Sequence, residues 1–219
     1  MDASVASMRR TSPPRSGIAE RIWEAARREF SNRGYHGARV QGIARGASCN
    51  VALIYRHWAS KRALYLDILR AVWVAAAGEI SRLVDGSPGG AAAVVGAYLD
   101  AMMRDPMGAQ MLIREYLDGS PFLSELCAAE PALLEPVRRA AAALSGPGDA
   151  AGSAVDPVLA VVTVGGVAAL VASAQEAARP FVEAPLPPEA WRRHVFDLLL
   201  NGLAPGQPGR AANGASALR

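Results

Sequence analysis

Apolar residues recur along this chain every three or four positions, which is the spacing of one face of an α-helix. The pattern runs from Ile18 through Ile22 and Ala26 to Phe30, and it returns in most of the later segments. No stretch shows the strict apolar–polar alternation of a half-buried strand. The sequence therefore predicts an all-α protein, with helices at 17–33, 40–46, 51–57, from the Ser60 cap to about Val84, 91–104, 107–117, 122–144, 157–179 and 189–203.

Glycine and proline mark where these helices begin and end. Gly34 follows the first helix, at the position of a C-cap. Pro106 and Pro157 each follow an aspartate and suit the first helical position, where a missing N–H costs nothing. Pro131 and Pro136 fall inside 122–144, so we expect that helix to be kinked or divided.

The helices expected at 17–33, 40–46 and 51–57 have the layout of a helix-turn-helix unit. Asn50 and Ser60 are good N-caps, because their side-chain oxygens can accept hydrogen bonds from free N–H groups at a helix start. Ile54 and Trp58 are expected to pack inward. Small and polar residues of 51–57 then face outward, as a helix that enters the major groove of DNA requires.

The charge of the chain is divided unevenly. Residues 1–70 hold 13 Lys and Arg against 5 Asp and Glu, a net charge of +8, whereas residues 71–219 carry a net charge of −5. A basic segment attracts polyanions such as nucleic acid through counterion release. The alternative is a solvated, arginine-rich surface, and charge alone does not decide between the two.

The run from Ile43 to Tyr65, IARGASCNVALIYRHWASKRALY, resembles the DNA-binding signature of TetR-family transcriptional regulators. The resemblance spans about residues 18–69, and the rest of the chain is similar only in length and in its expected helices. Its most specific elements fall in register: Tyr55, Trp58, Ser60-Lys61 and Ala63-Leu64, preceded by Ala25-Ala26, Glu29-Phe30 and Gly34-Tyr35.

The resemblance implies which residues contact DNA. Tyr55, His57 and Lys61 match positions that bind backbone phosphates, and Lys61 is the only lysine beside 22 arginines. Other residues match positions that face base edges, where Arg56 can read guanine and Leu53 or Ala52 can touch a thymine methyl group. The full set of expected DNA-binding residues is Arg39, Gln41, Asn50, Val51, Ala52, Leu53, Tyr55, Arg56, His57 and Lys61.

This sequence departs from the family pattern at the helix of 40–46 and its turn. Arg39 stands where the family has a capping Ser or Thr, so we expect a weaker cap. The turn carries Ser48 and Cys49 in place of Gly and Val, and Ser48 is expected to adopt a positive φ at a cost of about 1 kcal/mol. Gly42 inside the short helix costs roughly another 1 kcal/mol relative to alanine.

The resemblance also implies that the helices after the fourth enclose a pocket for a small molecule and that the last two form a homodimer. The expected function is a ligand-responsive homodimeric regulator, a repressor that binds a palindromic operator and is released by a small, largely apolar effector. The alternative for each candidate pocket residue is ordinary core packing. The candidates are Trp73, Tyr98, Met102, Met103, Met107, Met111, Tyr116 and Phe122.

Residues 158–174 contain no charged side chain, so a membrane anchor has to be weighed against a buried helix at a subunit interface. Asp156 precedes the run and Glu176 follows it closely, and basic and aromatic anchors are missing. The interface interpretation is therefore favoured, and we expect no membrane partner.

The expected domains are a disordered arm at 1–16, a helix-turn-helix DNA-binding domain at 17–62, a helical effector-binding and dimerisation domain at 63–204, and a disordered tail at 205–219. Arg9, Arg10 and Arg15 of the arm could touch phosphates. The chain starts without a secretory apolar run, so a cytoplasmic location is expected. His36, His57 and His194 lack metal-ligand spacing, and the sequence has neither a Gly-rich phosphate loop after a strand nor a nucleophile elbow. These features argue against an enzyme and against a metal or other cofactor. A ligand-independent architectural DNA-binding protein is the remaining alternative.

Overall fold

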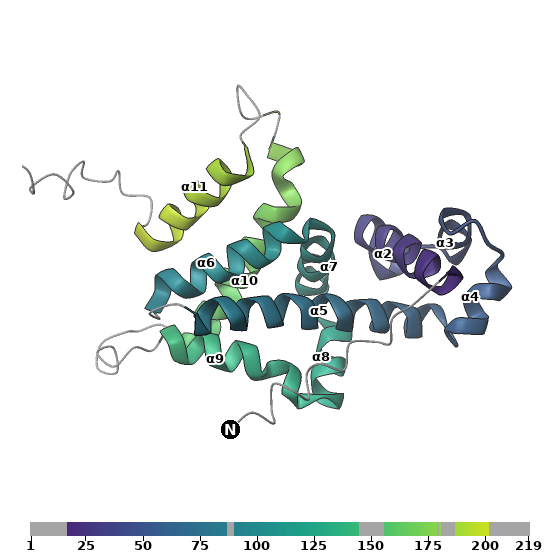
Figure 1. The fold of residues 1–219 in the computed structure, drawn as a ribbon, viewed down its shortest axis with the longest axis horizontal. Coiled ribbons are helices and arrows are strands. Elements are labelled where there is room, and N and C mark those ends of the chain that lie inside the picture. The colour runs from purple at the N-terminus through teal and green to yellow at the C-terminus, as the bar shows by residue number, and fades with distance from the viewer. Residues whose placement is uncertain (1–16, 87–89, 145–155, 179, 181–186, 202–219) are drawn as a thin grey trace, which may run out of the picture.

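The computed structural model describes residues 17–86, 90–144, 156–178, 180 and 187–201. All regular elements within these ranges are helices, as predicted. The molecule is elongated, with α2, α3 and α4 at one end and α6, α9 and α11 at the other (Figure 1). The segments expected to be a disordered arm at 1–16 and a disordered tail at 205–219 lie outside the described residues.

The first helix, α2 (Ile18–Gly37), extends three residues beyond Gly34 but is interrupted there. Gly34 has φ 66° and ψ 178°, which breaks the helical backbone. The backbone N–H of Ala38 donates a hydrogen bond to the Gly34 carbonyl oxygen over 3.2 Å. Gly34 therefore ends the regular part of the helix, as the sequence predicted, and residues 35–37 form a further turn before the next helix.

The helices α3 (Val40–Gly46) and α4 (Val51–His57) have the predicted bounds. The Asn50 side chain caps α4 by accepting a hydrogen bond from the Leu53 N–H over 2.8 Å. The turn between α3 and α4 contains Ser48 at φ 51°, so the expected positive φ is confirmed. These features fix the angle at which α4 leaves the turn.

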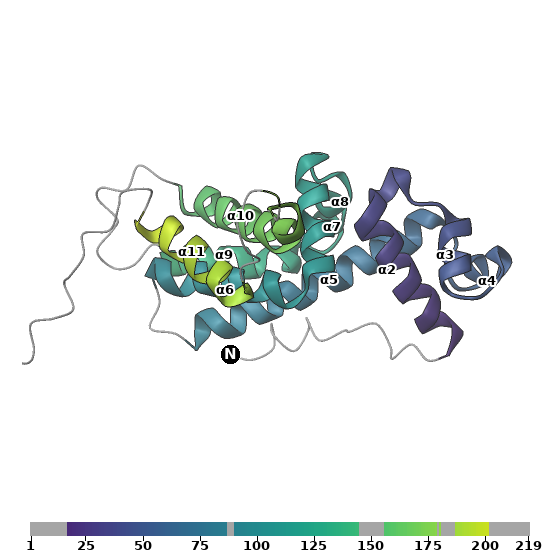
Figure 2. The ribbon, with the colours of Figure 1, turned by 90° about the horizontal axis from the view of Figure 1, so that it is seen from above.

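The longest helix, α5 (Lys61–Asp85), has 25 residues and a length of about 37 Å. Ser60 caps it by accepting from the Ala63 N–H over 3.0 Å. Two views show that α5 runs from the end of the molecule that holds α4 into the bundle of later helices (Figures 1 and 2). Its predicted apolar stripe is buried and joins the two ends of the molecule through one continuous core: Leu64, Ile68, Val72, Ile80 and Val84.

The later helices form a bundle around the second half of α5. The region expected to be kinked or divided is divided, because a 3₁₀ turn at Pro131–Leu134 separates two α-helices. The helix α10 packs against α6, α7 and α9, and α11 packs against α6. The helices are α6 (Gly90–Arg104), α7 (Pro106–Leu117), α8 (Pro121–Ala129), η1 (Pro131–Leu134), α9 (Glu135–Leu144), α10 (Pro157–Ala178) and α11 (Pro188–Asn201).

The helix α10 has one buried and one exposed apolar face. Val161, Ala168 and Ala169 are almost completely buried. Leu159 and Leu170 are 65% and 53% exposed, and both are large apolar residues. Among the described helices, none has the length and apolar character needed to cross a membrane. The exposed face of α10 therefore has no cover within the described part of this chain, and the expected subunit interface stays a prediction.

Candidate nucleic-acid interface and apolar cavity

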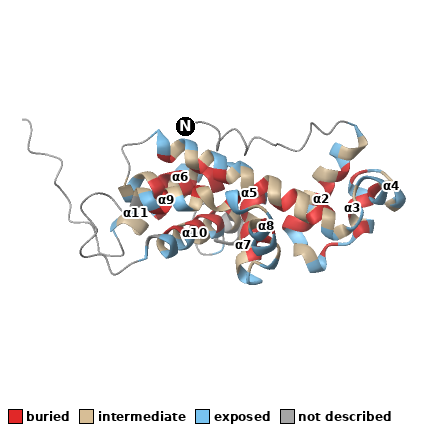
Figure 3. Ribbon diagram, turned by 90° about the horizontal axis from the view of Figure 1, so that it is seen from below, coloured by how far each residue is buried: buried red, intermediate tan, exposed pale blue. Residues whose placement is uncertain are grey.

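The expected DNA-binding residues lie together at one end of the molecule, on α3, α4 and the residues next to them. Tyr55 is 48% exposed even though it is a large aromatic residue. The exposed, pale blue residues of α3 and α4 face away from the bundle (Figure 3). The exposed members of the set are Arg39, Gln41, Asn50, Ala52, Tyr55, Arg56 and His57, and the half-buried ones are Val51, Leu53 and Lys61.

The opposite face of α4 is fixed by packing. Ile54 is 1% exposed and packs in the core with Ile43 and Ala47, which are equally buried. At the end of α4, the indole N–H of Trp58 donates to the Asp67 carboxylate on α5 over 2.9 Å. A short helix of seven residues is not stable alone, so this packing holds α4 in shape before any partner binds.

A carboxylate compensates for the weak cap at the start of α3. Arg39 makes no side-chain cap, as predicted, but its backbone N–H donates to Glu29 Oε1 on α2 over 3.2 Å. A methyl group at Gly42 would come within 2.8 Å of the same oxygen. Gly42 therefore leaves room for a negative charge at the positive end of α3, a role that the sequence did not reveal.

Lys61 is more enclosed than its predicted phosphate contact suggests. Its Nζ donates to the Ala38 carbonyl oxygen over 2.8 Å and lies 4.6 Å from the centre of the Tyr35 ring. Burial lowers the pKa of this ammonium group. An ammonium group has three donors, so two remain for a phosphate. Lys61 thus also joins the start of α5 to the junction of α2 and α3.

Polar contacts connect the helices that carry the candidate DNA-binding surface to the bundle. Arg27 on α2 forms an ion pair with Asp105, the N-cap of α7. Arg114 on α7 donates to the carbonyl oxygens of Ser31 and Asn32 over 3.0 and 2.9 Å. These contacts fix α7 against the middle and the end of α2.

An aromatic cluster completes this junction around a buried carboxyl group. Phe122 on α8 lies 4.5 Å from the Tyr35 ring and 5.0 Å from the Tyr65 ring, measured between ring centres. Glu115 is 2% exposed and accepts from the Tyr65 hydroxyl over 2.7 Å. Its other oxygen accepts from the N–H groups of Phe122 and Leu123 at the start of α8, over 3.2 and 3.1 Å. One buried side chain therefore joins α5, α7 and α8.

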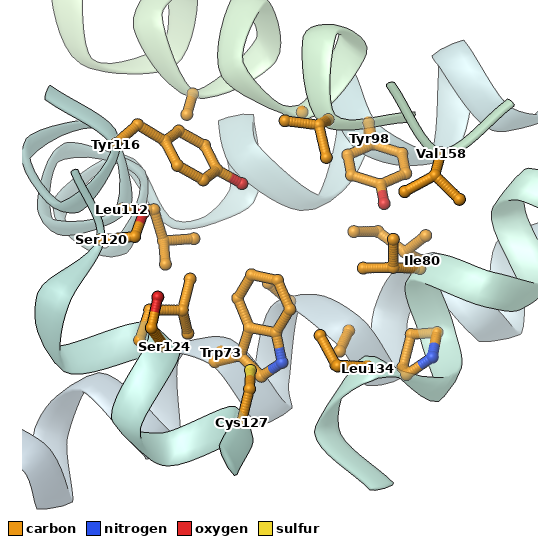
Figure 4. Close-up of a pocket in the computed structure, with 18 of the residues that line it drawn as sticks. Trp73, Ile80, Tyr98, Leu112, Tyr116, Ser120, Ser124, Cys127, Leu134 and Val158 are labelled. Carbon is orange, nitrogen blue, oxygen red and sulfur yellow. The ribbon is translucent and has the colours of Figure 1, made fainter. Parts of the chain in front are cut away.

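A cavity of about 590 Å³ lies inside the bundle, between α5, α6, α7, α8, α9 and α10 (Figure 4). This volume falls within the range of about 300–1,000 Å³ that is typical of small-molecule sites. None of the described residues that line it is charged. The lining is Trp73, Ala76, Ala77, Ile80, Tyr98, Met102, Leu112, Tyr116, Ser120, Leu123, Ser124, Cys127, Ala128, Leu134, Pro136, Val137, Val158, Val162, Gly165 and Ala169.

Four of the candidate pocket residues line this cavity, namely Trp73, Tyr98, Met102 and Tyr116. The other four do not. Phe122 packs in the aromatic cluster, and Met111 is buried in the core at 1% exposure. Met107 is 38% exposed, and Met103 is half-buried against the core. These four side chains do not reach the cavity because they lie on other faces of the same helices, or pack at a helix start beside the junction.

The cavity's polar groups are few and uncharged. The Trp73 indole N–H already donates to the Leu133 carbonyl oxygen over 2.8 Å. Burial raises the pKa of the Tyr98 and Tyr116 phenols and of the Cys127 thiol, so these groups keep their protons at neutral pH. Among the described residues, no group of three or more His, Cys, Asp or Glu could hold a metal ion.

These features define a class of protein: an all-helical fold with a helix-turn-helix unit at one end and an apolar cavity in the bundle behind it. A family model described as "Bacterial regulatory proteins, tetR family" matches residues 22–68. Residues 22–68 therefore match the model of this family, and the chain as a whole has the fold of a solved TetR-like transcriptional regulator. No curated protein matches the sequence.

Solved structures share this fold over nearly their whole length. The fatty acid degradation regulator FadR from Bacillus halodurans is 18% identical, with a TM-score of 0.61 over 87% of this chain and 98% of its own. A TetR-like regulator from Rhodococcus sp. RHA1 is also 18% identical, with a TM-score of 0.58 over 87% and 98%. FadR from Bacillus subtilis, in complex with stearoyl-CoA, is 15% identical, with a TM-score of 0.55 over 84% and 99%. At these identities, the likeness shows the fold alone.

Proposed function

We propose that this protein is a homodimeric transcriptional regulator, a cytoplasmic repressor that holds operator DNA through α4 and releases it when a small molecule fills the cavity. One observation carries the proposal. The seven-residue helix α4 presents Tyr55, Arg56 and His57 to solvent while Ile54 anchors it in the core, within the segment that matches the tetR family. A rigid helix with a basic, exposed face is what the major groove accepts.

The proposed division into a DNA-binding domain at 17–62 and an effector and dimerisation domain at 63–204 places the boundary within the first turn of α5. Because α5 continues from the first domain into the second, it is the element through which a change in the cavity can move α4. Trp73 and Ile80 on α5 line the cavity, and Trp58 is tied to Asp67 on the same helix.

The wall formed by α8 offers a second route between the cavity and DNA. Leu123 lines the cavity, and the neighbouring Phe122 packs against Tyr35 beside Lys61. A ligand that displaces α8 would disturb the Glu115 hydrogen bonds and this aromatic contact together. The ligand can shift DNA binding only by as much as its affinity differs between the two arrangements.

Dimerisation through α10 and α11 is the third part of the proposal. The exposed face of α10 carries Leu159 and Leu170, and exposed apolar surface favours association. Leu170→Glu is expected to give monomers in light scattering at concentrations where the original protein is dimeric. Leu117→Glu is the matched control, because Leu117 is 79% exposed on α7 and its change should leave the dimer intact. Monomers from the control alone would contradict this assignment.

Selection of bound sequences from random duplex DNA tests DNA recognition. The expected product is a palindrome whose half-sites lie about 34–36 Å apart, one turn of B-DNA. The same selection with Arg56→Ala should give a product with relaxed preference at one base pair of each half-site. A ligand-independent architectural protein would instead give no consensus, and no small molecule would alter its binding. The cavity favours the regulator over this alternative.

A further inference from the structure

Two tyrosine hydroxyls in the cavity have no hydrogen-bond partner within the described part of the chain. Tyr98 on α6 is 7% exposed, and its hydroxyl points into the cavity, as does that of Tyr116 on α7 (Figure 4). No group among the described residues forms a hydrogen bond with either hydroxyl. A hydroxyl that faces a cavity can donate a hydrogen bond to a bound molecule, so a ligand that accepts it gains affinity and orientation.

The rest of the lining limits what that ligand can be. Among the described residues, no lysine, arginine, histidine, aspartate or glutamate lines the cavity. A carboxylate or an ammonium group buried here would lose its hydration without gaining an opposite charge. The aliphatic and aromatic side chains that form most of the wall favour apolar surface instead, so the ligand's charged groups, if it has any, have to remain outside.

The width of the cavity at these tyrosines depends on one glycine. A methyl group at Gly165 on α10 would come within 3.0 Å of Tyr98 Cε1 and 3.7 Å of the Tyr116 hydroxyl oxygen. The neighbouring Gly166 differs, because a methyl group there would meet only Tyr116 Cδ2, at 4.0 Å. Gly165 therefore lets the Tyr98 ring lie close to the α10 backbone and keeps the space between the two phenols open.

We infer that the cavity takes an uncharged, mainly apolar molecule with a hydrogen-bond acceptor, such as a ketone or ester carbonyl, that reaches the Tyr98 and Tyr116 hydroxyls. Gly165 sets the space available to that molecule. The regulatory meaning of this inference rests on the proposed function, but the binding chemistry does not require it. A fatty carboxylate and a coenzyme A thioester of such an acid are the competing ligand classes.

The test uses the full chain without DNA and N-phenyl-naphthylamine, a neutral dye that fluoresces in apolar cavities. Undecan-2-one and undecanoate, which have the same chain length, compete with the dye, and stearoyl-CoA serves as a third competitor. We expect the ketone to displace the dye at concentrations about tenfold lower than either charged molecule. Equal or better displacement by undecanoate or stearoyl-CoA would overturn the inference, as would failure of the dye or the ketone to bind.

Variants then assign the effect to the named residues. The double variant Tyr98→Phe, Tyr116→Phe should bind the dye as before but bind the ketone about tenfold more weakly, and an unchanged ketone affinity would overturn the role of the hydroxyls. Gly165→Ala should weaken ketone binding about tenfold, whereas Gly166→Ala should not. Equal affinities in these two variants would contradict the role of Gly165. Circular dichroism spectra of all variants confirm folding.

The outcome is separable from that of the proposed function. Ketone binding in a protein that selects no DNA sequence would leave the cavity chemistry standing and refute the regulator. Sequence-specific DNA binding in a protein whose cavity prefers undecanoate would support the regulator and refute the inferred cavity chemistry.

Discussion

The hydrogen bond between Tyr65 and Glu115 should contribute measurably to the stability of the fold. Tyr65 is 2% exposed, and its hydroxyl donates to Glu115 Oε1 over 2.7 Å at the junction of α5, α7 and α8. Tyr65→Phe keeps the ring, which packs against Phe30 and Phe122, and removes only the donor. The Glu115 oxygen then stays buried without that partner, which costs its desolvation free energy.

The expected loss follows from the chemistry of the bond. A buried hydrogen bond to a carboxylate contributes about 1.5–3 kcal/mol to the free energy of unfolding. For a chain of 219 residues, that corresponds to a fall in melting temperature of roughly 3–12 °C. Thermal unfolding followed by circular dichroism measures the shift. Both proteins have to be compared at one concentration, because association changes the melting temperature.

Tyr98→Phe is the matched control for this prediction. It removes the same atom from a tyrosine that is nearly as buried, but the Tyr98 hydroxyl faces the cavity and has no hydrogen-bond partner among the described residues. Its melting temperature should therefore stay close to that of the original protein. Equal shifts in melting temperature for the two variants would show that the Tyr65–Glu115 hydrogen bond adds nothing to the stability of the fold. That result would refute its role at the junction.

Three further predictions concern DNA affinity, helix packing and pH. Tyr55→Phe should weaken binding to the selected operator and to unrelated duplex by a similar factor, roughly tenfold, in titrations at fixed salt; a loss confined to the operator would contradict a phosphate contact. Gly78→Ala, at an open position on α5, should raise the free energy of unfolding by up to about 1 kcal/mol, whereas Gly42→Ala should gain less because its methyl group displaces a carboxylate. Equal gains in the free energy of unfolding for these two variants in urea titrations would argue against crowding between the new methyl group and that carboxylate. Burial raises the pKa of Tyr98 and Tyr116 above the usual 10.0 of tyrosine, so the folded state favours the protonated phenols. The two phenols should therefore leave the free energy of unfolding independent of pH below pH 10.0 and lower it as the pH rises above that value. A free energy of unfolding that stays constant above pH 10.0 in urea titrations would contradict this.

Local signals in the sequence were sufficient to predict where the helices lie. The bounds of α3 and α4 follow from Asn50, Ser60 and the apolar spacing, because caps and periodicity act within a few residues of one another. The positive φ of Ser48 was predictable because Ser48 stands where the family that the sequence resembles has a glycine. The expected DNA-binding residues all lie on one surface, but their contacts with DNA remain predictions.

Features that depend on distant residues could not be predicted. The carboxylate of Glu29 over Gly42 and the bond from Lys61 to Ala38 join separate helices, and no spacing within one helix indicates them. The cavity shows the same limit. By side-chain type alone, Met103 and Phe122 were as good pocket candidates as Met102 and Tyr116. Only the packing of α6, α7 and α8 decides which of them line the cavity.

The enclosed position of Lys61 makes it a useful spectroscopic probe. The chain has no other lysine, so methylation with isotopically labelled formaldehyde would mark one side chain besides the terminal amine. Its ammonium group contacts the Ala38 carbonyl oxygen and the Tyr35 ring, whose magnetic shielding makes the resonance sensitive to small displacements. A single labelled methyl signal would then report the arrangement where α2, α3 and α5 meet, with and without DNA or a cavity ligand, from one simple spectrum.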